Sequence, residues 1–278
     1  MIALAERALA APMLSAEQLA EYNETGHVLC RGFLEKSDVA ALRPGILAAF
    51  ERHRPEAKEI TRPRTAYENA FIQVVNMGLS EPDVRALTRS PRLGQAAAML
   101  MGTAGARIFI EDAMFKEPGR GHTPWHQDGS CLPLEPRHMV TAWVPLVPVH
   151  ADSGRLRFVR GSHHLGLLGP VDITEETDAF FSQRIERDGL TIDENPPMQP
   201  GDVSFHAGTT IHSALANHST HMRELIAIHY FADGARISEL DNPTRQNMAA
   251  HCAPQLCTGD LAVSDAWPLV YPNRSDRP

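Results

Sequence analysis

The chain has 278 residues, of which 43% are hydrophobic, 22% charged and 6% aromatic. This is ordinary globular composition, so extensive disorder is excluded and a sizeable core is expected. The formal net charge of −8 leaves no basic excess to neutralise phosphates, which argues against a nucleic-acid or anionic-membrane partner and favours a small-molecule substrate.

No apolar run approaches the roughly 20 residues that a membrane-spanning helix needs. Near the N-terminus, Glu6 and Arg7 interrupt the apolar stretch that a signal peptide requires. The four cysteines lack metal-type CxxC spacing and are interpreted as free thiols; they are Cys30, Cys131, Cys252 and Cys257. We therefore expect a cytoplasmic protein.

The first third of the chain is predicted to be mainly helical. Ser15 and Gln18 have the spacing of a capping box at the start of a helix. Apolar residues at three- and four-residue steps predict a second helix over residues 37–50, and Ser90-Pro91 predicts the start of a third that ends near residue 101. Between the first two helices, a β-branched and aromatic stretch predicts a short strand over residues 27–33.

After residue 106 the pattern changes to short apolar stretches separated by Gly, Pro and Asp. Strands are predicted at residues 108–115, 140–145, 156–159, 203–206 and 225–231. Their spacing favours an antiparallel sandwich or barrel. We expect one mainly β domain over residues 1–278, in which residues 1–105 are mainly helical support and residues 106–278 form the β core. The pattern does not assign an acidic insert at about 161–200, although inserts of this length in enzymes often act as lids.

A possible metal-binding pair lies at His126-Gln-Asp128. Side chains of an extended segment alternate between its two faces, so His126 and Asp128 are expected to point the same way and to bind one metal ion together. An H-x-D tripeptide alone is a common chance occurrence, and this one needs a third ligand.

Two histidines compete for the third position, His206 and His212. If the following segment folds as a hairpin that turns at Asn217 and His218, His212 and Arg223 face each other across its strands. A ligand at His206 would leave Arg223 out of register. We therefore favour His212 as the ligand.

Two histidines and one carboxylate on one face of a metal leave three coordination positions open, which is the arrangement of non-haem Fe(II) oxygenases. Zinc hydrolases use similar ligands but usually keep a single open position for water. The planar guanidinium of Arg223 suits bidentate binding of a carboxylate, as the tail of a co-substrate would require. A surface ion pair with Glu224 or another acid is the alternative role for this arginine.

Further motifs follow one another in an order that resembles one family. They are Leu14 to Tyr22, Gly26-His-Val28, Gly32-Phe-Leu34, His126-Gln-Asp128, Ala142-Trp143, Gly161-Ser-His163, Gly201-Asp202, His212 and Arg223. Over nearly its whole length the chain resembles the phytanoyl-CoA dioxygenase-like (PhyH) family of Fe(II)- and 2-oxoglutarate-dependent oxygenases.

The resemblance implies a double-stranded β-helix core, also called a jelly-roll or cupin-like fold, with helical N-terminal support. It places Fe(II) on His126, Asp128 and His212, and the distal carboxylate of 2-oxoglutarate on Arg223. It also implies that Trp143 lines the co-substrate pocket and that Gln127 contacts the cofactor. The expected reaction is hydroxylation of a small molecule by O₂ with release of succinate and CO₂, and desaturation, epoxidation or ring formation are possible in the same pocket.

The chain departs from the family pattern at two positions. Arg160 stands where a proline often precedes Gly-Ser-His, and Ala214 stands where a hydroxyl often follows the distal ligand. Ser213 is a substitute for that hydroxyl. Gln73 and Asn76 are candidates for the contact to the proximal end of 2-oxoglutarate, and ordinary loop polar groups describe them equally well.

Two other functions stay open. A metal-dependent hydrolase or isomerase can use the same barrel, because fold does not fix reaction. A non-catalytic small-molecule-binding protein is the second alternative. His229, which alternates in phase with apolar strand positions, is interpreted as a core histidine with satisfied hydrogen bonds.

Overall fold

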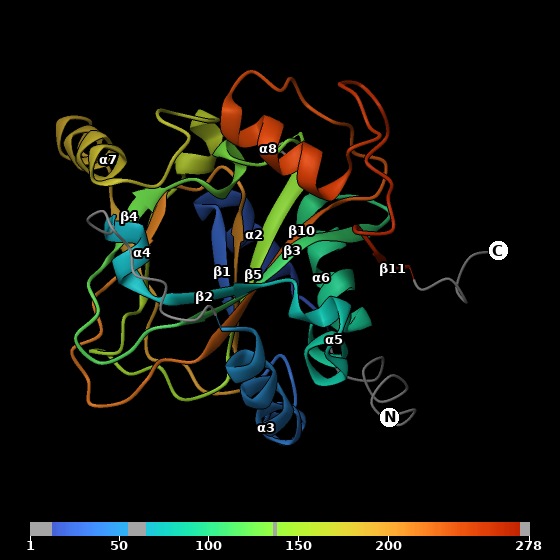
Figure 1. Ribbon diagram of the computed structural model, residues 1–278. Helices are drawn as coiled ribbons and strands as arrows, with labels where there is room; N and C mark the ends of the chain where they lie inside the picture. Colours follow the sequence, from blue (N-terminus) through green and yellow to red (C-terminus); the bar gives the residue numbers. More distant parts are fainter. Residues whose placement is uncertain (1–12, 55–64, 136–137, 273–278) are drawn as a thin grey trace.

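The computed structural model describes residues 13–54, 65–135 and 138–272 (Figure 1). Glu6 and Arg7, on which the signal-peptide interpretation rests, therefore lie outside the described residues. In chain order the elements are α2 (Ala16–Thr25), β1 (His27–Cys30), α3 (Lys36–His53), α4 (Ala66–Ala70), β2 (Ile72–Val75), η1 (Met77–Leu79), α5 (Pro82–Thr88), α6 (Pro91–Met101), β3 (Ala106–Phe115), β4 (Thr123–His126), η2 (Asp128–Ser130), β5 (Met139–Pro145), β6 (Leu156–Val159), η4 (Ser162–Leu165), α7 (Glu175–Arg187), β7 (Ile192–Glu194), β8 (Val203–Ala207), β9 (His212–Ala214), β10 (Leu225–Ala232), α8 (Pro243–Cys252) and β11 (Leu269–Tyr271).

The helix starts predicted from local chemistry are confirmed. Ser15 Oγ accepts a hydrogen bond from the Gln18 amide at 3.2 Å, and Gln18 Oε1 accepts one from the Ser15 amide at 2.8 Å, which is a complete capping box at the start of α2. Gly26 ends this helix with φ +84°, a left-handed conformation that a side chain disfavours. Pro91 occupies the first turn of α6.

The strands form two antiparallel sheets. The larger sheet has the order β1-β8-β5-β10-β3-β11, with β2 also paired to β3, and the smaller has the order β4-β9-β6-β7. From β3 to β6, and again from β7 to β10, successive strands alternate between the two sheets. This arrangement is the double-stranded β-helix that the resemblance implied, and the fold prediction is confirmed.

The large sheet separates two environments because successive side chains point to opposite faces. On β10, Ile226, Ile228 and Tyr230 join the main hydrophobic cluster, to which helices α2, α3, α5 and α6 also contribute. The intervening Ala227 packs in a second cluster with side chains from the small sheet. The active-site candidates lie on this inner face.

Helical layers flank the sheets in Figure 1. Helix α6 packs across β3, β5, β10 and β11, whereas α7 packs against β4 of the small sheet. The insert at about 161–200 contributes η4, α7 and β7, so it contains a helix and an edge strand of the core. No helix in residues 13–54, 65–135 and 138–272 is long and apolar enough to cross a membrane.

Candidate active site

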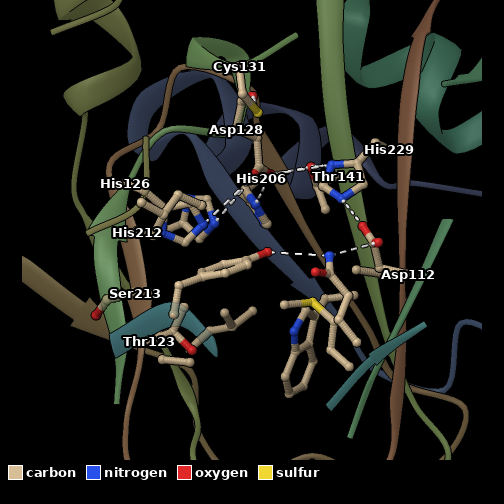
Figure 2. A pocket seen from close by; sticks show the side chains of 18 of the residues that line it. Asp112, Thr123, His126, Asp128, Cys131, Thr141, His206, His212, Ser213 and His229 are labelled. Atoms are coloured by element: carbon tan, nitrogen blue, oxygen red, sulfur yellow. Dashed lines mark hydrogen bonds and ion pairs between the residues drawn. The ribbon is translucent and has the colours of Figure 1, made fainter. Parts of the chain in front are cut away.

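Three side chains with metal-binding atoms, His126, Asp128 and His212, meet between the two sheets (Figure 2). His126 at the end of β4 lies directly opposite His212 on β9, and Asp128 begins the 3₁₀ turn η2. All three are buried, and their ligand atoms lie within 4.8 Å of one another. The Nε2 atoms of both histidines are 3.6 Å from Asp128 Oδ1, so three donor atoms converge on one point.

The two histidines are held in the tautomer that a metal requires. Nδ1 of His126 lies 2.7 Å from the Pro124 carbonyl, and Nδ1 of His212 lies 3.0 Å from the Thr210 carbonyl. A carbonyl only accepts, so each Nδ1 carries the proton and each Nε2 presents a lone pair. Burial lowers the pKa of His126 to about 3 and that of His212 to about 4, which keeps both rings neutral.

The carboxylate of Asp128 is ionised and bound on one side only. Burial opposes its ionisation, but His212, His229 and His206 together hold its pKa well below the usual range. Thr141 Oγ1 donates to Oδ2 at 2.6 Å, and His206 Nε2 lies 3.0 Å from the same oxygen. Oδ2 is thereby saturated, and Oδ1 faces the two ligand histidines.

A chain of hydrogen bonds continues from this carboxylate to the far wall of the site (Figure 2). His229 Nδ1 lies 3.1 Å from Thr141 Oγ1, and His229 Nε2 lies 3.1 Å from Asp112 Oδ2. Gln73 Nε2 then donates to Asp112 Oδ1 at 3.0 Å and to the Tyr67 hydroxyl at 3.4 Å. Burial works against protonation of His229, but Asp128 and Asp112 raise its pKa above the ordinary value. His229 is thus a half-buried histidine, and both of its nitrogens are hydrogen-bonded, as predicted.

Arg223 is buried with no carboxylate partner among the described residues. The residue is 2% exposed, Nη1 donates to the Gly154 carbonyl at 2.7 Å, and Nε has no hydrogen-bond partner within residues 13–54, 65–135 and 138–272. The guanidinium carbon lies 5.2 Å from the centre of the Trp143 ring. Burial without a neighbouring anion lowers the pKa of Arg223 to about 9. A buried cation of this kind is costly unless a ligand supplies the missing negative charge.

These groups line one cavity of about 150 Å³. Its walls come from both sheets, α4, α8 and the insert, and among the described residues they are Tyr67, Gln73, Ile110, Asp112, Met114, Thr123, His126, Asp128, Cys131, Leu132, Thr141, Trp143, Leu156, Ile173, His206, His212, Ser213, Ala214, Arg223, Ala227, His229 and Met248. The cavity therefore joins three metal-type ligands to an arginine that has no carboxylate partner in the described part of the chain.

A family model described as phytanoyl-CoA dioxygenase (PhyH) matches residues 22–225, a span that includes the three clustered side chains and Arg223. The chain belongs to the PhyH family. It is an iron- and 2-oxoglutarate-dependent dioxygenase, and the resemblance noted in the sequence is confirmed.

Individual PhyH relatives agree with this result. The chain is 26% identical over 230 residues to the methylphosphonate hydroxylase of Gimesia maris, an overlap of 79% of this chain and 81% of the relative. The structure of the epimerase SnoN from nogalamycin biosynthesis, with Fe³⁺, α-ketoglutarate and nogalamycin RO, has a TM-score of 0.72 and 27% identity, with coverage of 91% and 97%. EctD from S. alaskensis with 2-oxoglutarate and 5-hydroxyectoine has a similar fold, with a TM-score of 0.65, 21% identity and coverage of 81% and 78%.

One step of the sequence argument for this PhyH site is wrong. His212 and Arg223 do not pair across a hairpin, because β9 pairs with β4 and β6 in the small sheet. Arg223 instead forms a bridge with Lys116, next to the strands of the large sheet. In a double-stranded β-helix successive strands alternate between sheets, so residues 215–224 cross over where a hairpin was expected. The two side chains still line the same cavity, from opposite sheets.

Of the residues predicted to contact the cofactor, some line the cavity and others do not. Gln73 lines the cavity, but Asn76 does not appear in its wall. Gln127 lies outside it: its amide donates to the Gly166 and Thr209 carbonyls, and its Oε1 accepts from the Leu168 amide at 2.7 Å. Gln127 lies between two candidate ligands that share a face, so its side chain points to the opposite face. The structure therefore does not support the predicted contact between Gln127 and the cofactor.

Ser213 contributes to the cavity wall, but its hydroxyl accepts a hydrogen bond from Arg157 Nε at 3.1 Å. In Figure 2 this hydroxyl points away from His212. Thr123 is a candidate, missed by sequence reasoning, for the hydroxyl of the family pattern. It is buried, lines the cavity and lies directly opposite Ala214 across β4 and β9. The signal lay in the strand register, which pairs Thr123 with Ala214, the position where this chain lacks the hydroxyl of the family pattern.

Proposed function

We propose that this dioxygenase hydroxylates a small molecule, with iron on His126, Asp128 and His212 and the distal carboxylate of 2-oxoglutarate on Arg223. The observation that carries the proposal is that Arg223 is buried in the same cavity as the three ligand side chains and has no carboxylate partner among the residues the structure describes. Two neutral imidazoles and one carboxylate suit ferrous iron and leave positions open for a chelating co-substrate and O₂. The names of the relatives, methylphosphonate hydroxylase and EctD with 5-hydroxyectoine, support a small-molecule substrate.

Iron and 2-oxoglutarate, when bound, supply the oxidising chemistry: O₂ is consumed, 2-oxoglutarate becomes succinate and CO₂, and the substrate gains a hydroxyl group. The chain's own residues position and shield these partners. Arg223 offers its fork to the distal carboxylate, and Trp143 packs against the same guanidinium. Thr123 provides a hydroxyl in the same cavity, which accepts a hydrogen bond from Lys116 Nζ at 3.4 Å.

The two alternative functions explain less of the site. A metal-dependent hydrolase or isomerase gives Arg223 no anion to bind, and a purely binding protein needs no convergent set of neutral histidines and an ionised carboxylate. Release of succinate in the presence of Fe(II), 2-oxoglutarate and O₂ separates a dioxygenase from both.

The test compares His126→Ala, Asp128→Ala and His212→Ala with a matched control, His218→Ala, which removes an exposed histidine outside the cavity. Each triad variant is expected to lose stoichiometric Fe(II), measured by elemental analysis after anaerobic dialysis, and to lose succinate release. His218→Ala should keep both. Full iron binding and turnover by any triad variant would contradict the assignment.

A further inference from the structure

Lys116 is a second buried cation next to Arg223. The two backbones form an antiparallel bridge, in which each amide donates to the other residue's carbonyl at 2.9 Å. Side chains of directly opposite residues lie on the same face of such a pair. A Cβ atom at Gly154 would stand 3.1 Å from Lys116 Cδ and 3.4 Å from Arg223 Nη1, so both side chains pass the same point of the backbone.

The amine of Lys116 contacts three oxygen atoms. Nζ lies 2.8 Å from the Gly121 carbonyl, 3.0 Å from the Leu215 carbonyl and 3.4 Å from Thr123 Oγ1. An ammonium group can donate to all three oxygens, whereas a neutral amine has two hydrogens and one lone pair. Because the two carbonyls only accept, they take both hydrogens of the neutral amine, and the Thr123 hydroxyl must then donate its own proton to Nζ.

The charge of Lys116 therefore decides where the Thr123 hydroxyl directs its proton. Thr123 lines the cavity that Arg223 also lines. Beside a neutral amine, the hydroxyl proton is bound to Nζ and only oxygen lone pairs are left for a ligand. Beside an ammonium group, the hydroxyl accepts from Nζ, and its proton is free to be donated to a carboxylate.

Electrostatics favours the neutral amine before a carboxylate binds and the ammonium group afterwards. Burial, with a smaller contribution from the positive charge of Arg223, lowers the pKa of Lys116 to about 6. A carboxylate bound to Arg223 offsets that positive charge and places a negative charge near the amine. Opposite charges attract strongly where water is excluded, so the bound anion stabilises the protonated form of Lys116.

In the described part of the chain, the other charged groups on the segments around Lys116 are paired or exposed. The ion pairs are Glu117–Arg120 on its own turn, Arg155–Glu194 on the loop that contains Gly154, and Glu224–Arg43 next to Arg223. The exposed titratable groups are His122, Asp152, His218 and His221. Arg223 is the charged group that lowers the pKa of Lys116, so an anion bound to Arg223 acts where the amine is sensitive to charge.

We propose that 2-oxoglutarate binds together with one proton, which Lys116 takes up from solvent, and that the resulting ammonium group turns the Thr123 hydroxyl toward the distal carboxylate. The step forms one N–H bond at Nζ and changes no bond of 2-oxoglutarate. Lys116 is then a positioning residue, because it acts on the co-substrate through Thr123. This inference rests on the proposed function, since it assumes that the distal carboxylate binds to Arg223.

The test is calorimetric titration of 2-oxoglutarate into the anaerobic Fe(II) form of the full chain, at about pH 7.5 and in buffers of different ionisation enthalpy, which counts the protons bound with the co-substrate. Lys116→Met removes the titrating group, and Lys36→Met makes the same change at an exposed lysine outside the cavity. If Lys116→Met does not retain Fe(II), Lys116→Gln takes its place, because its amide offers two N–H donors to the Gly121 and Leu215 carbonyls.

We expect the wild type and Lys36→Met to take up about 0.5–1 proton per 2-oxoglutarate, and the Lys116 variant to take up less by the same amount. Binding that includes a proton weakens as pH rises, so the wild-type affinity should fall by about 3- to 10-fold from pH 7 to pH 8 while that of the Lys116 variant stays nearly constant. No proton uptake by the wild type, or equal uptake by the wild type and the Lys116 variant, would overturn the inference alone. Failure of the Fe(II) protein to bind 2-oxoglutarate, or equal affinity in Arg223→Ala, would refute the proposed function and the inference with it.

Discussion

His206 Nε2 lies 3.0 Å from Asp128 Oδ2, on the opposite side of the carboxylate from the oxygen that faces His126 and His212. The histidine that competes with His212 in the sequence therefore has a different place in the structure. It bonds to one member of the candidate ligand set and is not part of that set, which consists of His126, Asp128 and His212.

This geometry predicts an intermediate loss when His206 is changed. His206→Ala should keep iron but weaken its binding by about 10-fold, at the low end of the effect of removing an outer partner of a ligand. His206→Gln, whose amide can still donate to Asp128, should recover part of the affinity. Competition with a chromophoric chelator measures both constants. Iron-free His206→Ala beside metal-replete His212→Ala would show that the two histidines are assigned the wrong way round.

The paired hydroxyls Thr123 and Ser213 give a matched test of the co-substrate pocket. Thr123→Val should weaken 2-oxoglutarate by about 3- to 10-fold, because one hydrogen bond to the distal carboxylate is lost. Ser213→Ala should leave this affinity unchanged, since its hydroxyl is bound to Arg157. Isothermal titration of the anaerobic Fe(II) protein measures both. The reverse ranking would restore Ser213 as the substitute hydroxyl.

Gln127 is predicted to matter for stability and not for the cofactor. Its side chain joins the 3₁₀ segment after β6 to the β8–β9 connection through the Gly166, Leu168 and Thr209 backbone. Gln127→Ala leaves these groups unsatisfied, so the free energy of unfolding should fall by about 1–3 kcal/mol. Chemical denaturation checks the loss, and 2-oxoglutarate affinity should stay at the wild-type value. Unchanged stability with weakened 2-oxoglutarate would contradict this placement.

Lys116 is expected to make the free energy of unfolding rise as the pH increases above neutrality. It is fully buried, and burial, with a smaller contribution from Arg223, lowers its pKa from 10.5 to about 6. Between these values the unfolded chain binds a proton that the folded chain does not, so stability rises with pH. At 1.36 kcal/mol per pH unit, the wild type should gain about 2–3 kcal/mol more than Lys116→Met between pH 7 and pH 9. Parallel denaturation curves that keep a constant gap between the two proteins would show that Lys116 is charged in the folded state.

Local sequence patterns predicted most of the helices and strands, but they did not predict which distant strands pair with one another. The capping box at Ser15 and the proline at position 91 act within one helical turn, so the sequence alone locates those helix starts. The choice of partner for β9 depends on segments far apart in the chain, and a hairpin was the simplest local solution. The strand β9 is short, and its own sequence does not indicate that it pairs with β4 and β6.

In the candidate site, too, the features set by local sequence were predicted and those set by contacts between distant segments were missed. His126 and Asp128 were paired through strand alternation, which is local, and the same alternation should have directed Gln127 to the other face. Thr123 was missed because its relation to Ala214 exists only across the β4–β9 register. Tyr67 was missed because α4 reaches the cavity through tertiary packing that no pattern in its own sequence indicates.

The central claim is that Arg223 binds the distal carboxylate of 2-oxoglutarate while three other residues hold iron. The most direct measurement titrates 2-oxoglutarate into anaerobic Fe(II) protein and follows the charge-transfer absorption in wild type, Arg223→Lys and Arg223→Ala. Loss of one partner of a buried, hydrogen-bonded charge pair costs about 2–5 kcal/mol, so Arg223→Ala should bind about 30-fold more weakly or worse. Arg223→Lys keeps the charge without the fork and should fall between the two, with iron affinity unchanged throughout. If Arg223→Ala binds 2-oxoglutarate as tightly as the wild type, the claim is wrong.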